Sequence, residues 1–130
     1  MKNNIKHVER FHDIMKIKNN HHPTLLETND YILRHSLGLE ELDEYKQACE
    51  DGDIVGICDA LGDQLYILLG TILRHGVQDV IQDVFDEIQR SNMSKLGVDG
   101  KPIYREDGKV LKGPNYSRPD IKSILDKKNA

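Results

Sequence analysis

Four acidic side chains on two adjoining segments have the types and spacing needed for metal chemistry. Glu41 and Glu44 are three residues apart, and Asp59 and Asp63 are four apart, so each pair shares one face of a helical segment. Converging carboxylates raise one another's pKa values unless a cation neutralises them. A ligand set made only of oxygen favours Mg²⁺ or Mn²⁺ over zinc. These residues therefore predict a site for a hard divalent cation.

A short turn at Gly52 would bring the two pairs to the same height. Glu44 lies eight residues before Gly52 and Asp59 seven after it, while Glu41 and Asp63 are each eleven residues away. In an antiparallel helical hairpin with a rise of about 1.5 Å per residue, the partners of each cross-helix pair differ in height by less than about 2 Å. All four carboxylates would then face one spot.

A solvated helix edge is the alternative interpretation of the first acidic pair. The stretch 40–44 is acidic at every position except Leu42, and such stretches are common on exposed helix faces. Asp59 and Asp63 argue against this alternative, because they are the only acids of a very apolar stretch, residues 54–73.

Apolar residues at three- and four-residue spacing predict four helices that position these acids. They lie within residues 1–20, at about 28–50, from 54 to 75 and at about 78–96. Asp53 is a good N-cap for the third helix, and Gly76 is its expected end. Asp107-Gly108 between short β-prone runs predicts a hairpin. The expected fold is all-α: a four-helix bundle with a small C-terminal β-hairpin, forming one domain over 1–130, with a helical core at about 1–97 and a tail at about 98–130.

Composition narrows the class of protein. The 130 residues carry 22 Asp plus Glu against 18 Lys plus Arg, a formal charge of −4 that disfavours nucleic-acid binding. We find no apolar run of about 18 residues and no secretory signal, so we expect a cytoplasmic protein that does not bind membranes. Cys49 and Cys58 are expected to be small buried apolar groups. The third helix is apolar almost all round, which predicts a homo-oligomer.

The order of several short blocks resembles the all-α nucleoside triphosphate pyrophosphohydrolases, the MazG-like superfamily that includes phosphoribosyl-ATP pyrophosphohydrolase. The resemblance spans most of the chain. Its blocks are Phe11-His12, Pro23-Thr24, Leu33-Arg34, Glu40-Glu41-Leu42-Asp43-Glu44, Asp59-Ala60-Leu61-Gly62-Asp63-Gln64-Leu65-Tyr66, Gly70-Thr71 and Arg90-Ser91-Asn92-Met93-Ser94-Lys95.

The resemblance implies a four-helix module that forms homodimers or homotetramers and hydrolyses a nucleoside triphosphate to the monophosphate and pyrophosphate with Mg²⁺. It implies that Glu41 and Glu44 are the metal-binding ExxE motif and that Asp63 is the aspartate of the second motif, ExxD. The chain departs from that second motif, since Ala60 stands where the family has glutamate. A related subgroup places a glutamate where this chain has Gly56. Asp59 is kept as a ligand because it can reach the same face.

The remaining expectations concern catalysis and the substrate. Glu41 or Glu44 is expected to act as general base on a water molecule. Asn92 and Lys95 match a family block and are expected to bind substrate, with a helix C-terminus bearing a favourable cation as the alternative. Arg34 could bind phosphate or form a surface ion pair, and Tyr116 could stack on the base or dock the hairpin.

Two other functions remain as alternatives to the expected hydrolase. A catalytically weak nucleotide-binding or scaffold bundle is the first, because Gly56 and Ala60 replace ligands of the family. A di-iron carboxylate bundle is disfavoured, because that class needs paired ExxH elements.

Overall fold

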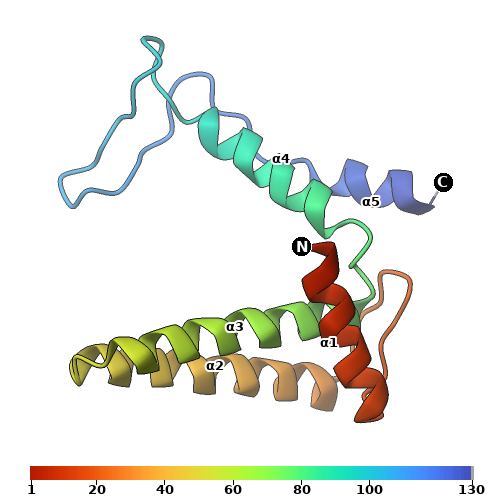
Figure 1. Ribbon diagram of the computed structural model, residues 1–130. Coiled ribbons are helices and arrows are strands. Elements are labelled where there is room, and N and C mark those ends of the chain that lie inside the picture. The colour runs from red at the N-terminus through yellow and green to blue at the C-terminus, as the bar shows by residue number, and fades with distance from the viewer. Residues whose placement is uncertain (130) are drawn as a thin grey trace. The chain divides into compact units, whose positions relative to one another are not determined.

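All regular elements among residues 1–129, which the computed structural model describes, are helices (Figure 1). The helices predicted within 1–20, over 28–50 and over 54–75 are confirmed, whereas the fourth helix is shorter than predicted and the last one was not predicted. The elements in chain order are α1 (Lys2–Ile14), α2 (Thr28–Glu50), α3 (Ile54–His75), α4 (Ile81–Met93) and α5 (Ile121–Asn129).

The chain forms two compact units, Met1–Asp79 and Val80–Ala130. The first unit contains α1, α2 and α3, and the second contains α4 and α5. The prediction that the whole chain acts as one domain stays a prediction.

The first unit is built on α3, which packs against both α2 and α1. Figure 1 shows α2 and α3 running side by side, with α1 crossing them near the C-terminal end of α3. The turn between α2 and α3 depends on Gly52, whose φ of 65° favours glycine. Asp53 caps α3 as predicted, because its carboxylate accepts a hydrogen bond from the Gly56 N–H at 3.0 Å. The core of this unit includes Val8 and Leu73, which are almost completely buried.

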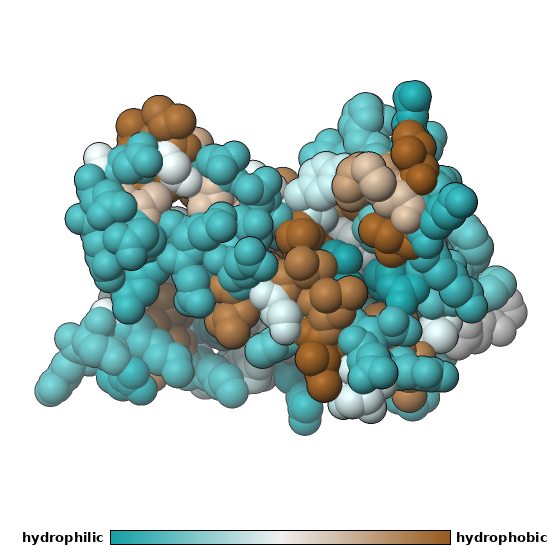
Figure 2. Space-filling view, turned by 90° about the horizontal axis from the view of Figure 1, so that it is seen from below, coloured by the Kyte–Doolittle hydropathy of each residue, from teal (hydrophilic) through white to brown (hydrophobic). Residues whose placement is uncertain are grey.

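Many apolar side chains of α3 remain exposed. Leu61, Leu65 and Leu68 are 49%, 48% and 56% exposed, and Figure 2 shows apolar side chains among hydrophilic ones on one face of the molecule. By length and composition alone, α3 with its 22 residues is long and apolar enough to cross a membrane. The helix contains no uninterrupted apolar run of about 18 residues, because Asp59 and Asp63 lie within its apolar stretch.

Both cysteines are exposed free thiols, so the prediction that they are buried was wrong. The reason is the rotational position of each residue around its helix axis. Ala48 precedes Cys49 and is only 8% exposed, and Ala60 on α3 is only 2% exposed. The alanines take the inward positions, and the neighbouring cysteine positions point outward.

The predicted β-hairpin is replaced by an irregular loop in the second unit. Among the described residues it contains one isolated antiparallel bridge, Tyr104 to Val110, and no strand. The predicted turn is present: Asp107 accepts a hydrogen bond from the Lys109 N–H at 3.0 Å, and Gly108 has φ 88°. Residues 98–112 are all exposed, and two short strands without a covering layer are marginal in water.

Candidate metal and active site

Three of the four predicted acids converge between α2 and α3. Each of Glu41, Glu44 and Asp63 offers one carboxylate oxygen, and these oxygens all lie within 4.8 Å of one another. Glu41 and Asp63 are half-buried and Glu44 is exposed. We call these residues the acidic cluster.

The helical hairpin explains why residues 19 and 22 positions apart in sequence meet. Glu41 and Asp63 are equally far from Gly52, so the antiparallel packing of α2 on α3 places them at one height. Glu44 is three residues after Glu41 and therefore lies on the same side of α2. The sequence predicted this convergence correctly for these residues.

The surroundings of Glu41 favour the protonated form of its carboxyl group. Its pKa is raised to about 7, first by desolvation, then by a hydrogen bond with Glu44 and by the negative charges of Glu44, Asp63 and Glu40. Its Oε2 atom is buried and has no hydrogen-bond partner among the described residues. A buried oxygen without a partner, next to two further carboxylates, is the donor set that a hard divalent cation fits.

Asp59, the fourth predicted ligand, lies outside the acidic cluster and is exposed. Ala60, which stands three residues before Asp63, is 2% exposed and occupies the inward position one turn earlier on α3. Asp59 is rotated by about 100° from that inward position, as one residue of an α-helix is. The described geometry therefore supports three ligands from this chain, not four.

Arg34 lies on α2, 9% exposed, and its donors point into the first unit. Its Nε donates to the Thr71 hydroxyl at 3.0 Å, and its Nη2 donates to the Ile67 carbonyl at 2.7 Å. The surface ion pair that was the alternative interpretation involves a different residue, because Asp30 pairs with Arg74 at 3.1 Å. Contact between Arg34 and a phosphate stays a prediction.

The other predicted substrate residues belong to the second unit. Asn92 is exposed at the end of α4, and Lys95 is half-buried just after it. The tail docks there, since the Lys95 carbonyl accepts a hydrogen bond from the Gly113 N–H at 2.7 Å. The Lys112 ammonium lies 4.7 Å from the centre of the Tyr116 ring, a cation–π contact. Binding of a nucleotide by these residues stays a prediction.

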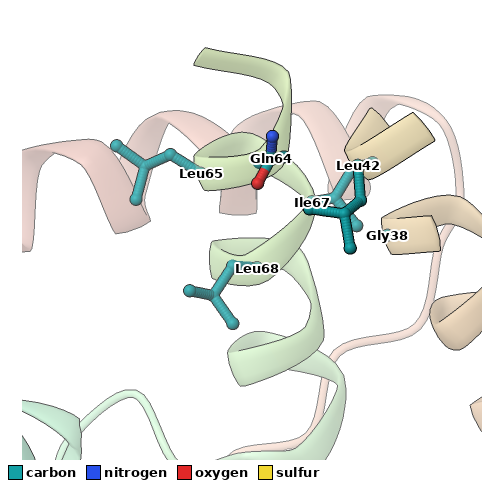
Figure 3. A pocket seen from close by; sticks show the side chains of 6 residues that line it. All are labelled: Gly38, Leu42, Gln64, Leu65, Ile67 and Leu68. Atoms are coloured by element: carbon teal, nitrogen blue, oxygen red, sulfur yellow. The ribbon is translucent and has the colours of Figure 1, made fainter. Parts of the chain in front are cut away.

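Residues of both helices, among them the sequence neighbours of Glu41 and Asp63, line an apolar groove of about 300 Å³. Gln64, beside Asp63 in sequence, has a buried Nε2 without a hydrogen-bond partner among the described residues. Figure 3 shows Leu65 and Leu68 projecting from one side of α3, whereas Ile67 extends toward Leu42 of α2. This groove was not predicted from the sequence, and its one sequence signal is Gln64 within an apolar helix. The lining residues are Gly38, Leu42, Gln64, Leu65, Ile67 and Leu68.

Comparison with known proteins identifies the family and a structure of similar fold. The sequence profile of the family described as phosphoribosyl-ATP pyrophosphohydrolase matches residues 8–92, a range that includes the whole acidic cluster. No curated protein matches the chain in sequence. A crystal structure of an inferred NTP pyrophosphohydrolase from Exiguobacterium sp. 255-15 has a similar fold, with a TM-score of 0.54 and 23% identity over 98% of this chain and 96% of that chain.

Proposed function

The chain belongs to the phosphoribosyl-ATP pyrophosphohydrolase family and is a hydrolase of that kind; from this premise we propose that it is a Mg²⁺-dependent nucleoside triphosphate pyrophosphohydrolase. It would convert a nucleoside or deoxynucleoside triphosphate to the monophosphate and pyrophosphate, in a house-cleaning or nucleotide-pool role. The observation that carries the proposal is the convergence of Glu41, Glu44 and Asp63 within 4.8 Å.

The acidic cluster has the donors that a metal-dependent phosphoanhydride hydrolase requires. Glu41, Glu44 and Asp63 would hold Mg²⁺, with Mn²⁺ as a substitute, through carboxylate oxygens. When bound, the ion would offset the negative charge of the phosphates and orient the attacking water. Glu41 or Glu44 would accept the proton from that water. The pKa of about 7 belongs to Glu41 without a cation, and a bound cation would lower that pKa and keep the carboxylate ionised.

The rest of the substrate would be held by residues outside the acidic cluster. Lys95 is proposed to bind phosphate and Asn92 to bind phosphate, sugar or base. Tyr116 is proposed to stack on the base. Arg34, the remaining predicted substrate contact, is not retained in this proposal, because its Nε and Nη2 already donate to Thr71 and Ile67 of α3.

A homodimer or homotetramer would cover the exposed apolar residues of α2 and α3. Leu42, Leu65 and Leu68, which line the apolar groove, are each about half exposed. Exposed aliphatic side chains grouped on one helical hairpin are typical of interfaces between copies of a chain. A membrane or a further protein would be the competing occupant.

A pyrophosphate-release assay tests the proposed activity. The full chain is incubated with a panel of triphosphates and with phosphoribosyl-ATP, with Mg²⁺, with Mn²⁺ and with a chelator. We expect turnover of at least one substrate that requires the cation and yields pyrophosphate rather than orthophosphate. Absence of turnover on every substrate, with circular dichroism showing a folded helical protein, would reject the enzyme proposal.

A catalytically weak nucleotide-binding or scaffold protein is the second candidate. Two observations favour it: Ala60 stands at the family's glutamate position, and Asp59 lies outside the acidic cluster. Calorimetric titration together with the pyrophosphate-release assay separates the two candidates. A scaffold would bind Mg²⁺ and a triphosphate in the titration and release no pyrophosphate in the assay.

A further inference from the structure

We propose that Arg34 is a positioning residue that fixes the register of α2 against α3 and so sets the geometry of the acidic cluster. The inference rests on the proposed function, because the purpose of that register is cation binding. It assigns to Arg34 a role through α3 in place of direct contact with substrate.

The first argument is the pattern of hydrogen bonds. Arg34 donates from Nε to the Thr71 hydroxyl and from Nη2 to the Ile67 carbonyl, at 3.0 and 2.7 Å. The Thr71 hydroxyl also donates to the Ile67 carbonyl at 3.1 Å. One planar guanidinium is thus held at two points on a single turn of α3, which fixes its position along the axis more strictly than a single contact would.

The second argument is the space made for the guanidinium. A Cβ atom placed on Gly70 would lie 2.6 Å from Arg34 Nη2 and 2.9 Å from His12 Nε2. His12 is itself 3% exposed, and its Nδ1 lies 2.6 Å from the Asn19 side-chain oxygen. Glycine at this position therefore leaves room for the Arg34 side chain of α2 and the His12 side chain of α1 against α3.

The third argument is the matching of heights. Arg34 precedes Glu41 by seven residues, while Ile67 and Thr71 follow Asp63 by four and eight. At 1.5 Å per residue these separations are about 10 Å on α2, and about 6 and 12 Å on α3. Because the helices are antiparallel, the Arg34 contact and the acidic cluster both require the same alignment of α2 along α3. A slip by one turn, about 5.4 Å, would break both.

The burial of Arg34, with no carboxylate partner among residues 1–129, supports a geometric role. The described hydrogen bonds of Arg34 are to a hydroxyl and a carbonyl. Burial and the nearby charge of Arg74 lower the pKa of Arg34. A charged group in such surroundings adds little net stability, but it can select one arrangement among similar ones.

Cation affinity of Arg34→Met and Arg34→Lys provides the first test. Methionine keeps most of the length of the arginine side chain but has no hydrogen-bond donor. Lysine keeps the positive charge but lacks the forked donors of the guanidinium. We expect Mn²⁺ affinity, measured by calorimetry on the folded full chain, to fall about tenfold or more in Arg34→Met, and less in Arg34→Lys. Val8→Ala is the matched control: it opens a cavity at a 1%-exposed core position on α1 and should lower the melting temperature without weakening Mn²⁺ binding.

Spin labels on the two native cysteines provide a readout that needs no cation. Cys49 and Cys58 are exposed on α2 and α3, and dilution with unlabelled chain isolates the distance within one molecule. We expect Arg34→Met to shift or broaden the distance distribution, and Val8→Ala to leave it unchanged.

The outcomes separate this inference from the proposed function. Unchanged distances and unchanged Mn²⁺ affinity in folded Arg34→Met would overturn it, as would a raised KM for the triphosphate with cation affinity unchanged, which marks a substrate contact. If the wild-type chain binds no Mn²⁺ but Arg34→Met still shifts the distances, the proposed function fails and the register role of Arg34 stands.

Discussion

At the scale of single residues, the position of a carboxylate relative to the contact between α2 and α3 decides whether it can bind a cation there. Glu44 has an oxygen within 4.8 Å of oxygens from Glu41 and Asp63, while Asp59 is exposed and outside this group. Similar residue types on the same two helices therefore differ in their expected contribution to catalysis.

Glu44→Gln and Asp59→Asn form a matched pair of neutralising substitutions. We expect Glu44→Gln to lower kcat/KM by at least about 100-fold, as loss of a metal ligand or general base does. We expect Asp59→Asn to change it by less than about fivefold, because exposed charge interactions are worth at most about 1 kcal/mol. Steady-state kinetics on the best substrate of the panel checks both values. A large loss in Asp59→Asn would restore Asp59 to the ligand set.

The raised pKa of Glu41 predicts how stability varies with pH in the absence of divalent cations. The ordinary pKa of 4.5 applies to the unfolded chain and a pKa of about 7 to the folded one. The folded state thus binds the proton more tightly, so this residue favours folding at low pH, and that contribution falls as pH rises from about 4.5 to about 7. Melting temperatures recorded in chelator should show this fall, and Glu41→Gln should remove it. A wild-type profile identical to that of Glu41→Gln contradicts the prediction.

At the scale of elements, the two ends of α3 show which glycines the fold requires. Gly52 and Gly76 both have positive φ, 65° and 69°. A Cβ on Gly52 would meet no atom within 4 Å, whereas one on Gly76 would lie 2.2 Å from the His22 backbone oxygen.

Gly76→Ala is therefore expected to destabilise the fold more than Gly52→Ala. The left-handed conformation alone costs an L-residue about 1–2 kcal/mol, which is the expected loss for Gly52→Ala. Gly76→Ala adds a backbone clash and should exceed that value. Urea unfolding measures both free energies, and equal losses would show that the loop at His22 moves aside.

The sequence was sufficient for elements whose signals are local. The bounds of α2 and α3, the Asp53 cap and the convergence of Glu41 with Asp63 follow from apolar spacing and from counting residues to Gly52. The sequence failed where the outcome depends on what covers a segment. The Asp107-Gly108 turn formed without strands because no layer packs on residues 98–112, and the phase of α3 placed Ala60, not Asp59, toward α2.

Arg34 illustrates a further limit of sequence reasoning. Its predicted phosphate contact and its actual donors to Ile67 and Thr71 call for the same residue type. Only the packing of α2 on α3 shows that the guanidinium turns into the first unit. Two glycines of α3 differ in the same way: a Cβ on Gly70 would clash with Arg34 and His12, whereas one on Gly62 would meet no atom within 4 Å.

At the scale of the whole molecule, the apolar face of α3 predicts assembly. Leu68→Gln changes a 56%-exposed residue of the apolar groove, whereas Leu25→Gln changes a 94%-exposed loop residue. We expect Leu68→Gln to lower the mass of the particle in analytical ultracentrifugation without loss of helicity, and Leu25→Gln to leave it unchanged. A wild-type chain that sediments as a monomer at all concentrations would contradict the proposed oligomer.

The long exposed loop of the second unit has a practical consequence for handling the protein. Residues 98–112 are all exposed and include Arg105, Lys109 and Lys112. Exposed loop tips are the preferred sites of proteolytic nicking, so trypsin at low concentration should cleave here first and separate the α5 segment from the family-matched region. The intact mass of a stored variant should accordingly be measured before a loss of activity is attributed to its substitution.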